Sequence, residues 1–320
     1  MSQMTPIQPL LSIVVPCFNE EQVLPSTAQL LLAVLEDLKM KTKISPESFI
    51  YFIDDGSGDA TWKIIEELHD SNPAVKGLKL AHNAGHQHAL LAGMLSLRGK
   101  IDCTISADAD LQDDISAIEG MIDEYCKGCD IVYGIRKERE HDTLLKKTSA
   151  LAFYRLMKLM GIDIVYNHAD FRLISRRALE TLSEFREVNL FLRGIIPLLG
   201  FRTAQIYYNR LERSAGVSKY NLRKMLSLAF DGITSFSVVP LRIISVLGLF
   251  FSCLSLSLGV WVFVSYLLGR TVPGWASTVL PIYVIGGIQL LSIGLIGEYL
   301  GKIFKEVKAR PRYIIEQELF

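Results

Sequence analysis

The sequence predicts an α/β domain with a mostly parallel sheet, followed by a hairpin of two transmembrane helices. Three observations lead to this prediction. Short β-prone runs alternate with amphipathic helical stretches up to about residue 140, a polar cluster follows each run, and two long uncharged segments lie near the C-terminus. Alternating strands and helices form right-handed βαβ units, which make a parallel sheet with helices on both faces.

The individual elements follow from the spacing of apolar residues. The predicted strands are Leu11–Pro16, Phe49–Asp54, Val75–Ala81, Asp102–Ala107 and Asp130–Ile135. The predicted helices between them are Glu21–Met40, Asp59–Ser71, His86–Leu97 and Ile115–Lys127. After a basic, irregular stretch suited to a loop, Lys137–Asp142, a further helix is predicted at about Thr143–Met160.

Polar residues follow all five predicted strands. The clusters are Pro16–Glu20, Asp54–Asp59, His82–His86, Asp108–Asp114 and Tyr133–Arg136. A single cluster is explained by turn formation, because Asp, Asn, Gly and Ser favour turns. Five clusters at the same edge are better explained by one site, since ligands bind beyond the carboxyl ends of the strands in such sheets.

The acidic segment after the fourth predicted strand is the most informative of these clusters. Asp108, Asp110 and Gln112 occupy alternate positions, which point to one side of an extended chain. Two carboxylates and an amide suit a hard divalent cation that also holds phosphate oxygens. Taken alone, an Asp-x-Asp pair is more typical of a solvated turn, and the metal site is favoured only by the motifs that follow.

The C-terminal third of the chain predicts a membrane anchor. The mean hydropathy of +0.28 is high for a soluble enzyme. No residue is charged from Ile243 to Leu268 or from Thr271 to Gly297, and each run exceeds the roughly 20 residues that cross a bilayer. The alternative, a pair of buried core helices, is disfavoured because the two runs are separated by only a short linker.

Cations flank the predicted hairpin on one side. Lys219, Arg223, Lys224 and Arg242 precede it, whereas Lys302, Lys305, Lys308, Arg310 and Arg312 follow it, and the connecting loop contains only Arg270. The positive-inside rule therefore places both chain ends in the cytoplasm. The predicted parts are a cytoplasmic catalytic domain (1–220), an amphipathic interfacial helix (221–237), two spans (238–304; about 240–268 and 275–300) and a cytoplasmic tail (305–320). For segment 221–237, packing on the soluble domain is the alternative.

Composition excludes several other classes. The N-terminus lacks the basic region and long apolar core of a signal peptide. Five cysteines, an odd number, fit a reducing cytosol. Cys126 and Cys129 are more typical of a helix end and a turn than of a metal site, because no second pair follows. The net charge of +0 gives no indication of nucleic-acid binding.

With these motifs in order, the chain resembles family 2 glycosyltransferases of the GT-A fold. It is most similar to polyprenyl-phosphate glycosyltransferases, namely bactoprenol glucosyltransferases and dolichyl-phosphate mannose synthases. The matching segments are Pro16–Glu20, Asp54–Asp59, Asp108–Gln112, Asp170–Arg172 and Arg210–Tyr220, together with the C-terminal hairpin. The resemblance covers nearly the whole chain, and the ordered set is far more specific than any one motif.

The resemblance implies roles for individual residues. Pro16, Phe18, Glu20 and Asp55 would line the base and ribose of a nucleotide, and Asp108 would touch the donor. Asp110 and Gln112 would hold Mg²⁺ or Mn²⁺ against the diphosphate. The phosphates would be bound by Arg136, Arg210, Arg213, Ser218 and Lys219, and Asp170 would correspond to the family's proposed catalytic base.

One position departs from the family pattern. Ala84 replaces a bulky residue, and His86 and His88 follow it. The two histidines either alter donor choice or simply form the polar face of a helix start, and the second interpretation is slightly favoured.

The implied reaction is inverting transfer of a hexose from a nucleotide diphosphate to undecaprenyl phosphate at the inner face of a bacterial cytoplasmic membrane. UDP-glucose is the first choice of donor, for O-antigen or other envelope glycans; UDP-N-acetylglucosamine, UDP-galactose and an aminoarabinose donor are alternatives. A non-catalytic nucleotide-sugar-binding regulator is the alternative of another class. The expected partners are a separate flippase and a downstream glycosyltransferase, and the resemblance implies a homotetramer.

Overall fold

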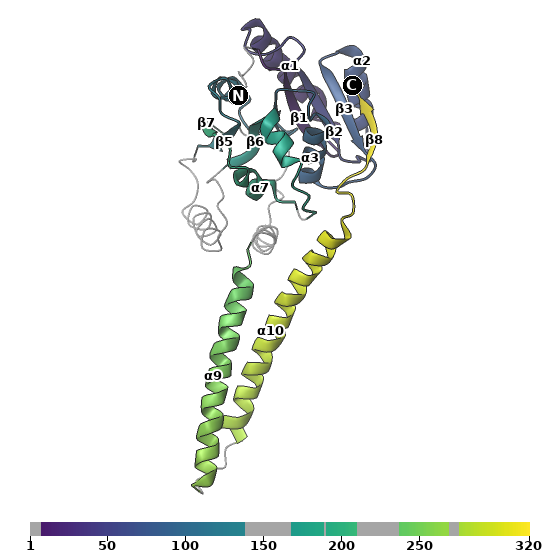
Figure 1. Ribbon diagram of the computed structural model, residues 1–320. Helices are drawn as coiled ribbons and strands as arrows, with labels where there is room; N and C mark the ends of the chain where they lie inside the picture. The colour runs from purple at the N-terminus through teal and green to yellow at the C-terminus, as the bar shows by residue number, and fades with distance from the viewer. Residues whose placement is uncertain (1–7, 138–167, 189, 210–236, 269–274) are drawn as a thin grey trace. The chain divides into compact units, whose positions relative to one another are not determined.

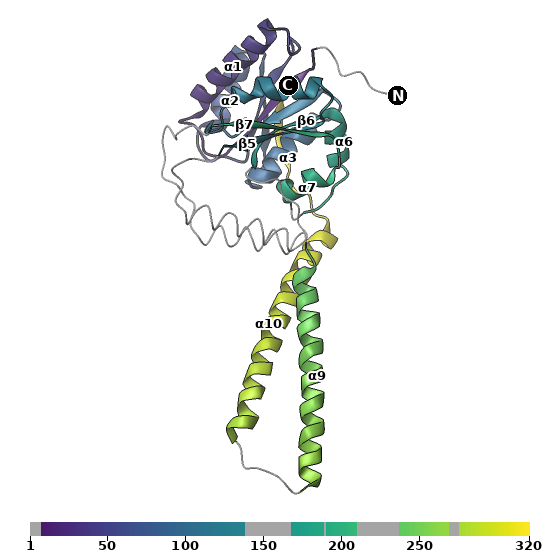
Figure 2. The same ribbon diagram turned by 90° about the vertical axis from the view of Figure 1, so that its left-hand side faces the viewer.

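The computed structural model describes residues 8–137, 168–188, 190–209, 237–268 and 275–320. These residues belong to two compact units, which are described separately (Figures 1 and 2). One unit contains the β-sheet and includes the C-terminal segment Arg310–Phe320, and the other contains the two long helices.

The first unit is built on a mixed sheet, which has eight strands in the described part of the chain, in the order β7-β5-β6-β4-β1-β2-β3-β8. Their bounds are β1 Leu11–Cys17, β2 Phe49–Asp54, β3 Val75–Leu80, β4 Cys103–Ser106, β5 Ile131–Arg136, β6 His168–Ser175, β7 Thr203–Tyr208 and β8 Ile315–Leu319. β6 is antiparallel to β4 and β5, and β8 is antiparallel to β3. The pairs β1–β2, β1–β4, β2–β3 and β5–β7 are parallel.

Helices cover both faces of this sheet. Their bounds are α1 Leu24–Met40, α2 Thr61–Ser71, α3 His86–Ser96, α4 Ala117–Cys126, α6 Arg176–Leu182 and α7 Leu192–Leu198. On one face Ile13 of β1 packs in a core that includes Leu31 and Leu35 of α1, with no exposed surface on any of the three. Burying each such side chain contributes about 1.5–3 kcal/mol.

A glycine allows α3 to lie close to the opposite face. A Cβ atom on Gly93 would stand 2.5 Å from Cδ1 of Ile53 and 2.8 Å from Cγ1 of Val14. Only glycine leaves room for this approach, which sets α3 and its N-terminal His86 against β1 and β2.

The structure confirms the five predicted strands and four predicted helices before residue 137, each within about three residues. The predictions did not include β6, β7, β8, α6 or α7. β8 lies within the segment predicted to be a cytoplasmic tail, where it pairs with β3 from Gly77 to Leu80. The helix predicted at Thr143–Met160 lies outside the described residues.

The second unit contains α9 (Val239–Leu267) and α10 (Trp275–Lys308), of 29 and 34 residues. At 1.5 Å per residue each is longer than the roughly 30 Å hydrocarbon core of a bilayer. The Tyr299 hydroxyl donates to the Ser237 carbonyl oxygen at 2.6 Å, so the C-terminal part of α10 lies beside the start of α9. Helices are present in both predicted ranges, 240–268 and 275–300, and α10 continues beyond the second to Lys308.

One helical stretch among the described residues, Val284–Lys308, is long and apolar enough to cross a membrane, with a mean hydropathy of 1.5. A shorter apolar stretch covers Val239–Phe251. The predicted interfacial helix lies outside the described residues except for Ser237.

Candidate functional site

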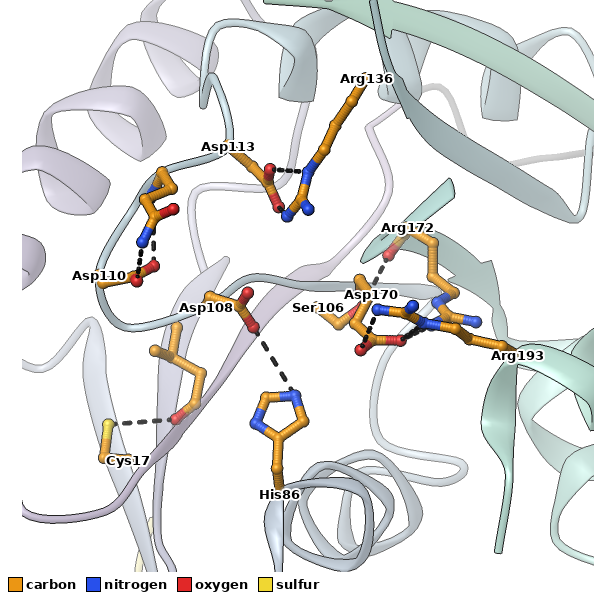
Figure 3. A network of polar contacts seen from close by, with 12 residues as sticks. Cys17, His86, Ser106, Asp108, Asp110, Asp113, Arg136, Asp170, Arg172 and Arg193 are labelled. Carbon is orange, nitrogen blue, oxygen red and sulfur yellow. Dashed lines mark hydrogen bonds and ion pairs between the residues drawn. The ribbon is translucent and has the colours of Figure 1, made fainter. Parts of the chain in front are cut away.

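The strands β1, β2, β3, β4 and β5 end at one edge of the sheet, and the predicted polar clusters meet there. β1, β2, β3 and β4 are parallel, and β5 has the same direction because both β4 and β5 are antiparallel to β6. Figure 3 shows side chains from three of these strand ends, from α3 and from α7 around one acidic loop.

The acidic loop after β4 contains the predicted metal ligands, but not in the predicted conformation. β4 ends at Ser106, the chain turns at Ala109–Asp110, and Leu111 has a left-handed φ of 43°. Asp108 and Gln112 are therefore not on one side of an extended strand. Instead the turn places the Gln112 side-chain amide against the Asp110 carboxylate, with Nε2 donating to Oδ2. The prediction of an extended arrangement was wrong, whereas the juxtaposition of Asp110 and Gln112 is present.

Asp113 closes this loop through an ion pair with Arg136 at the end of β5. Nε of Arg136 donates to Oδ1 of Asp113 at 2.8 Å, and Nη2 donates to Oδ2 at 3.1 Å (Figure 3). The side chain of Asp113 is only 6% exposed, so this forked contact fixes both partners. Arg136, a predicted phosphate ligand, is thereby held at the edge of the acidic loop.

Asp170 in β6 is held by two guanidinium groups. Arg172, two residues along the same strand, donates from Nη2 to Oδ1. Arg193 of α7 makes a forked contact, with Nε 3.2 Å from Oδ1 and Nη2 3.1 Å from Oδ2. Burial tends to raise the pKa of Asp170, but the two arginines outweigh it and hold that pKa well below its usual range. Asp170 is therefore an anion at neutral pH and a weak base.

In Figure 3, Asp108 lies between Asp110 of the acidic loop and Asp170, and it faces α3. Its Oδ1 is 3.7 Å from Nε2 of His86, the first residue of that helix. Burial raises the pKa of Asp108, and the carboxylates of Asp170, Asp113 and Asp110 raise it further, whereas His86 lowers it. Of the two histidines singled out in the sequence, His86 thus faces the site.

His88 has a local structural role. Its ring nitrogens lie 3.0 Å from the Ala84 carbonyl oxygen and 3.3 Å from the Val188 carbonyl oxygen. These contacts fit the interpretation of His88 as part of the polar face of a helix start.

The loops after β1 and β2 form the other part of the site. Phe18 is 46% exposed, and Asn19 accepts from the Gly58 amide at 2.9 Å, which connects the two loops. Asp55 is buried, and its two oxygens accept from the backbone amides of Ala84 and Gly85 at 2.7 and 3.0 Å. Asp55 therefore fixes the loop that precedes α3.

The remaining predicted residues divide into two groups. Pro16 is buried within β1 and Glu20 is half-buried beyond its end, with its amide bonded to Oγ1 of Thr61 at 2.9 Å. The predicted phosphate ligands Arg210, Arg213, Ser218 and Lys219 lie outside the described residues.

Among the described residues, no cluster of three or more His, Cys, Asp or Glu side chains forms a self-sufficient metal site. The donors of the acidic loop still fit a hard divalent cation, because carboxylate and amide oxygens are the ligands that such ions prefer. Four carboxylates and three guanidiniums meet in the part of this site that the structure describes. A bound diphosphate would add further negative charge, which favours a cation shared between Asp110, Gln112 and the ligand.

Sequence reasoning did not identify Arg193 or Asp113 as parts of the site. Asp113 belongs to the acidic segment, three residues after Asp110, and could have been identified as a site residue from that position. Arg193 is 23 residues from Asp170 in an otherwise apolar helix, and only the tertiary structure brings the two together.

The profile of glycosyl transferase family 2 matches residues 12–183. This chain belongs to that family. A glycosyltransferase of Bacillus subtilis, YkoT, which is uncharacterized, is 53% identical over 313 residues, covering 98% of this chain and 93% of that protein. The SfII prophage-derived bactoprenol glucosyl transferase of Shigella flexneri is 41% identical over 310 residues, covering 96% and 97%.

A solved structure shows the same fold. The mannosyltransferase PcManGT of Pyrobaculum calidifontis, in complex with GDP-mannose and Mn²⁺, superimposes with a TM-score of 0.50 over 95% of this chain and 88% of that chain, at 12% identity. The predicted GT-A fold of this family 2 glycosyltransferase is confirmed.

Proposed function

We propose that this glycosyltransferase transfers glucose from UDP-glucose to undecaprenyl phosphate, with inversion at the anomeric carbon. The observation that carries the proposal is the placement of the acidic loop beside an arginine-held aspartate at the carboxyl edge of the sheet. One group suits a metal-bound diphosphate, and the other suits a second anion. Similarity to bactoprenol glucosyl transferases over nearly the whole chain supports the choice of donor and acceptor.

The nucleotide is expected to bind over the ends of β1 and β2. The exposed ring of Phe18 offers a stacking surface for the base, next to Pro16 and Glu20. Asp55 accepts one amide on each oxygen, and a carboxylate oxygen can accept a second donor such as a base N–H or a ribose hydroxyl. Asp108 would contact the donor sugar or ribose.

Asp110 and Gln112 would hold Mg²⁺ or Mn²⁺ against the donor diphosphate. The bound ion would neutralise the charge that develops on the leaving diphosphate, so no general acid is needed. The solved mannosyltransferase with Mn²⁺ supports a divalent metal requirement.

The transfer itself is a direct displacement. An oxygen of the acceptor phosphate attacks the anomeric carbon, the bond from that carbon to the diphosphate oxygen breaks, and its electron pair leaves with UDP. The acceptor is a phosphate monoester, which is largely a dianion at pH 7 because its second pKa is about 6. It needs no strong base, and Arg136, Arg210, Arg213, Ser218 and Lys219 would bind the phosphates.

Asp170 was proposed as the base because of its place in the family pattern. Its two guanidinium partners and its depressed pKa favour an orienting role instead. In this function Asp170 would hold the guanidinium groups of Arg172 and Arg193 in place near the acceptor, and it would not remove a proton.

The two long helices would form a transmembrane hairpin in the bacterial inner membrane, with both chain ends in the cytoplasm. This arrangement keeps the site at the inner leaflet, where a polyprenyl chain presents its phosphate. A homotetramer, a separate flippase and a downstream glycosyltransferase acting on O-antigen or another envelope glycan complete the proposal.

A donor panel tests this function. Membranes containing the protein are incubated with Mn²⁺, undecaprenyl phosphate and one radiolabelled donor at a time: UDP-glucose, UDP-galactose, UDP-N-acetylglucosamine or a UDP-aminoarabinose. We expect label in the lipid phase from UDP-glucose, and its loss in Asp110→Asn. Transfer from another donor would overturn the choice of sugar, and no transfer from any donor would overturn the function.

A further inference from the structure

The two arginines that contact Asp170 differ in their freedom to move. Arg172 belongs to β6, a strand that lies between β4 and β5 in the sheet, and it is 1% exposed. Its Nε and Nη1 atoms are buried and have no hydrogen-bond partner among the described residues. The side chain of Arg193, in contrast, is 35% exposed and comes from the short helix α7. Arg172 is therefore a fixed counter-ion of Asp170, whereas Arg193 can reach a ligand.

The charges around Asp170 leave room for an additional anion. Two guanidiniums share the carboxylate of Asp170, and the next carboxylate, Asp108, faces His86 of α3. A further anion can bind Arg193 while its forked contact with Asp170 stays in place, because Arg172 shares the charge of that carboxylate.

The position of Arg193 distinguishes between the two phosphate groups of the proposed reaction. In Figure 3, Asp110 and Arg193 lie on opposite sides of Asp108. Asp110 belongs to the loop that would hold the diphosphate. In a direct displacement the attacking oxygen approaches the anomeric carbon from the face opposite the leaving oxygen. An anion bound by Arg193 would thus stand on the attacking side.

We propose that Arg193 binds the phosphate of the lipid acceptor, and that Asp170 acts as its positioning residue. This inference rests on the proposed function. The forked Asp170 contact aims the planar guanidinium, which is suited to bind two oxygens of a phosphate at once. Asp170 then contributes to the reaction through Arg193 and not by accepting a proton.

The test uses the full-length protein in detergent with Mn²⁺, and initial rates of transfer from UDP-glucose are measured against undecaprenyl phosphate concentration. The variants are Arg193→Gln and Arg193→Lys. The matched control is Arg177→Gln, because Arg177 makes a similar forked pair with Asp130, which precedes β5 at the opposite edge of the sheet. UDP binding and the melting temperature are measured for every variant.

We expect Arg193→Gln to raise the acceptor KM about tenfold or more, because a charge-assisted contact is lost. The donor KM and UDP binding should change less than twofold. Arg193→Lys should raise the acceptor KM less, since lysine keeps the charge but not the fork. Arg177→Gln should leave the acceptor KM, the donor KM and UDP binding unchanged.

Two results would overturn the inference while leaving the proposed function intact. In the first, the wild-type protein transfers sugar and both Arg193 variants have the same acceptor KM as the wild type. In the second, the Arg193 variants raise only the donor KM. If Arg193→Gln does not fold, Arg193→Lys decides by the same criterion. Failure of the wild-type protein to transfer sugar to undecaprenyl phosphate would instead contradict the proposed function.

Discussion

At the scale of single residues, the four carboxylates of the site differ in their partners, and this difference separates their roles. Asp113 and Asp170 are bound by arginines, and Asp108 faces His86. Asp110 lies on the loop surface against the Gln112 amide, where an incoming cation can reach its oxygens. In the proposed function, Asp108 and Asp110 would therefore bind the ligand, and Asp113 and Asp170 would hold the arginine guanidiniums in place.

Replacement of a metal ligand should harm transfer more than replacement of Asp170. In the proposed function Asp110→Asn would remove a charge that holds the metal ion against the diphosphate. We expect a loss in kcat of about 10²-fold or more, comparable to loss of an electrostatic contact in the transition state. Asp170→Asn should cost about tenfold, since Arg172 and Arg193 are both retained. Both rates are measured with saturating donor and acceptor, and a larger loss in Asp170→Asn would contradict this division of roles.

The pH dependence of transfer should follow the acceptor and not Asp170. The depressed pKa keeps Asp170 ionised throughout the pH range 5 to 8, so it does not titrate there. The acceptor phosphate gains a proton as the pH falls through about 6, and kcat/KM for the acceptor should decline below that value. The same acid limb should persist in Asp170→Asn. If Asp170 were the base, its replacement would abolish that limb.

The sequence was informative about these residues where chemistry is carried by adjacent positions. Asp108, Asp110 and Gln112 were identified from their spacing, although a left-handed Leu111 and a turn, not strand alternation, bring Gln112 to Asp110. Arg193 could not be identified, because its contact with Asp170 depends on where α7 packs. Such long-range pairs leave no periodic signal in a single sequence.

At the scale of elements, the parallel part of the sheet could be predicted because its strands are apolar runs between clear helices. β8 could not, since Ile315–Leu319 contains three polar residues and pairs with β3, more than 230 positions earlier in the chain. β6 was missed because His168–Ser175 combines polar and apolar residues and was interpreted only as a motif. Because β6 is antiparallel to β4 and β5, Asp170 near its start lies at the edge of the sheet where β4 and β5 end.

Two helical glycines should respond oppositely to alanine. In α3, Gly93→Ala would place Cβ 2.5 Å from Ile53, and such overpacking costs about 1–3 kcal/mol. In α4, the nearest atom to a Cβ on Gly120 is Ile206 Cδ1 at 3.5 Å, an ordinary contact, so Gly120→Ala should be neutral or gain up to about 1 kcal/mol from helix propensity. Melting temperatures of the purified variants give the comparison, and equal shifts of the same sign would refute the packing argument.

At the scale of the whole molecule, the proposed hairpin makes a prediction about which parts of the chain face each side of the membrane. Cys126 in the catalytic unit is exposed, and it should not react with a membrane-impermeant maleimide in intact cells. A cysteine introduced by Thr271→Cys, in the linker between the spans, should react. Labelling is compared before and after cell lysis, which should expose Cys126. Reaction of Cys126 in intact cells would contradict the proposed orientation of the chain in the membrane.

The most direct test of the proposed function compares two acceptors that differ only in the phosphate. Purified protein with Mn²⁺ and radiolabelled UDP-glucose is supplied with undecaprenyl phosphate or with undecaprenol, and the lipid product is isolated and its anomeric configuration determined. We predict transfer to undecaprenyl phosphate alone, with the configuration inverted relative to the donor. Equal transfer to undecaprenol, or retention of configuration, would contradict direct attack by an acceptor phosphate at this site.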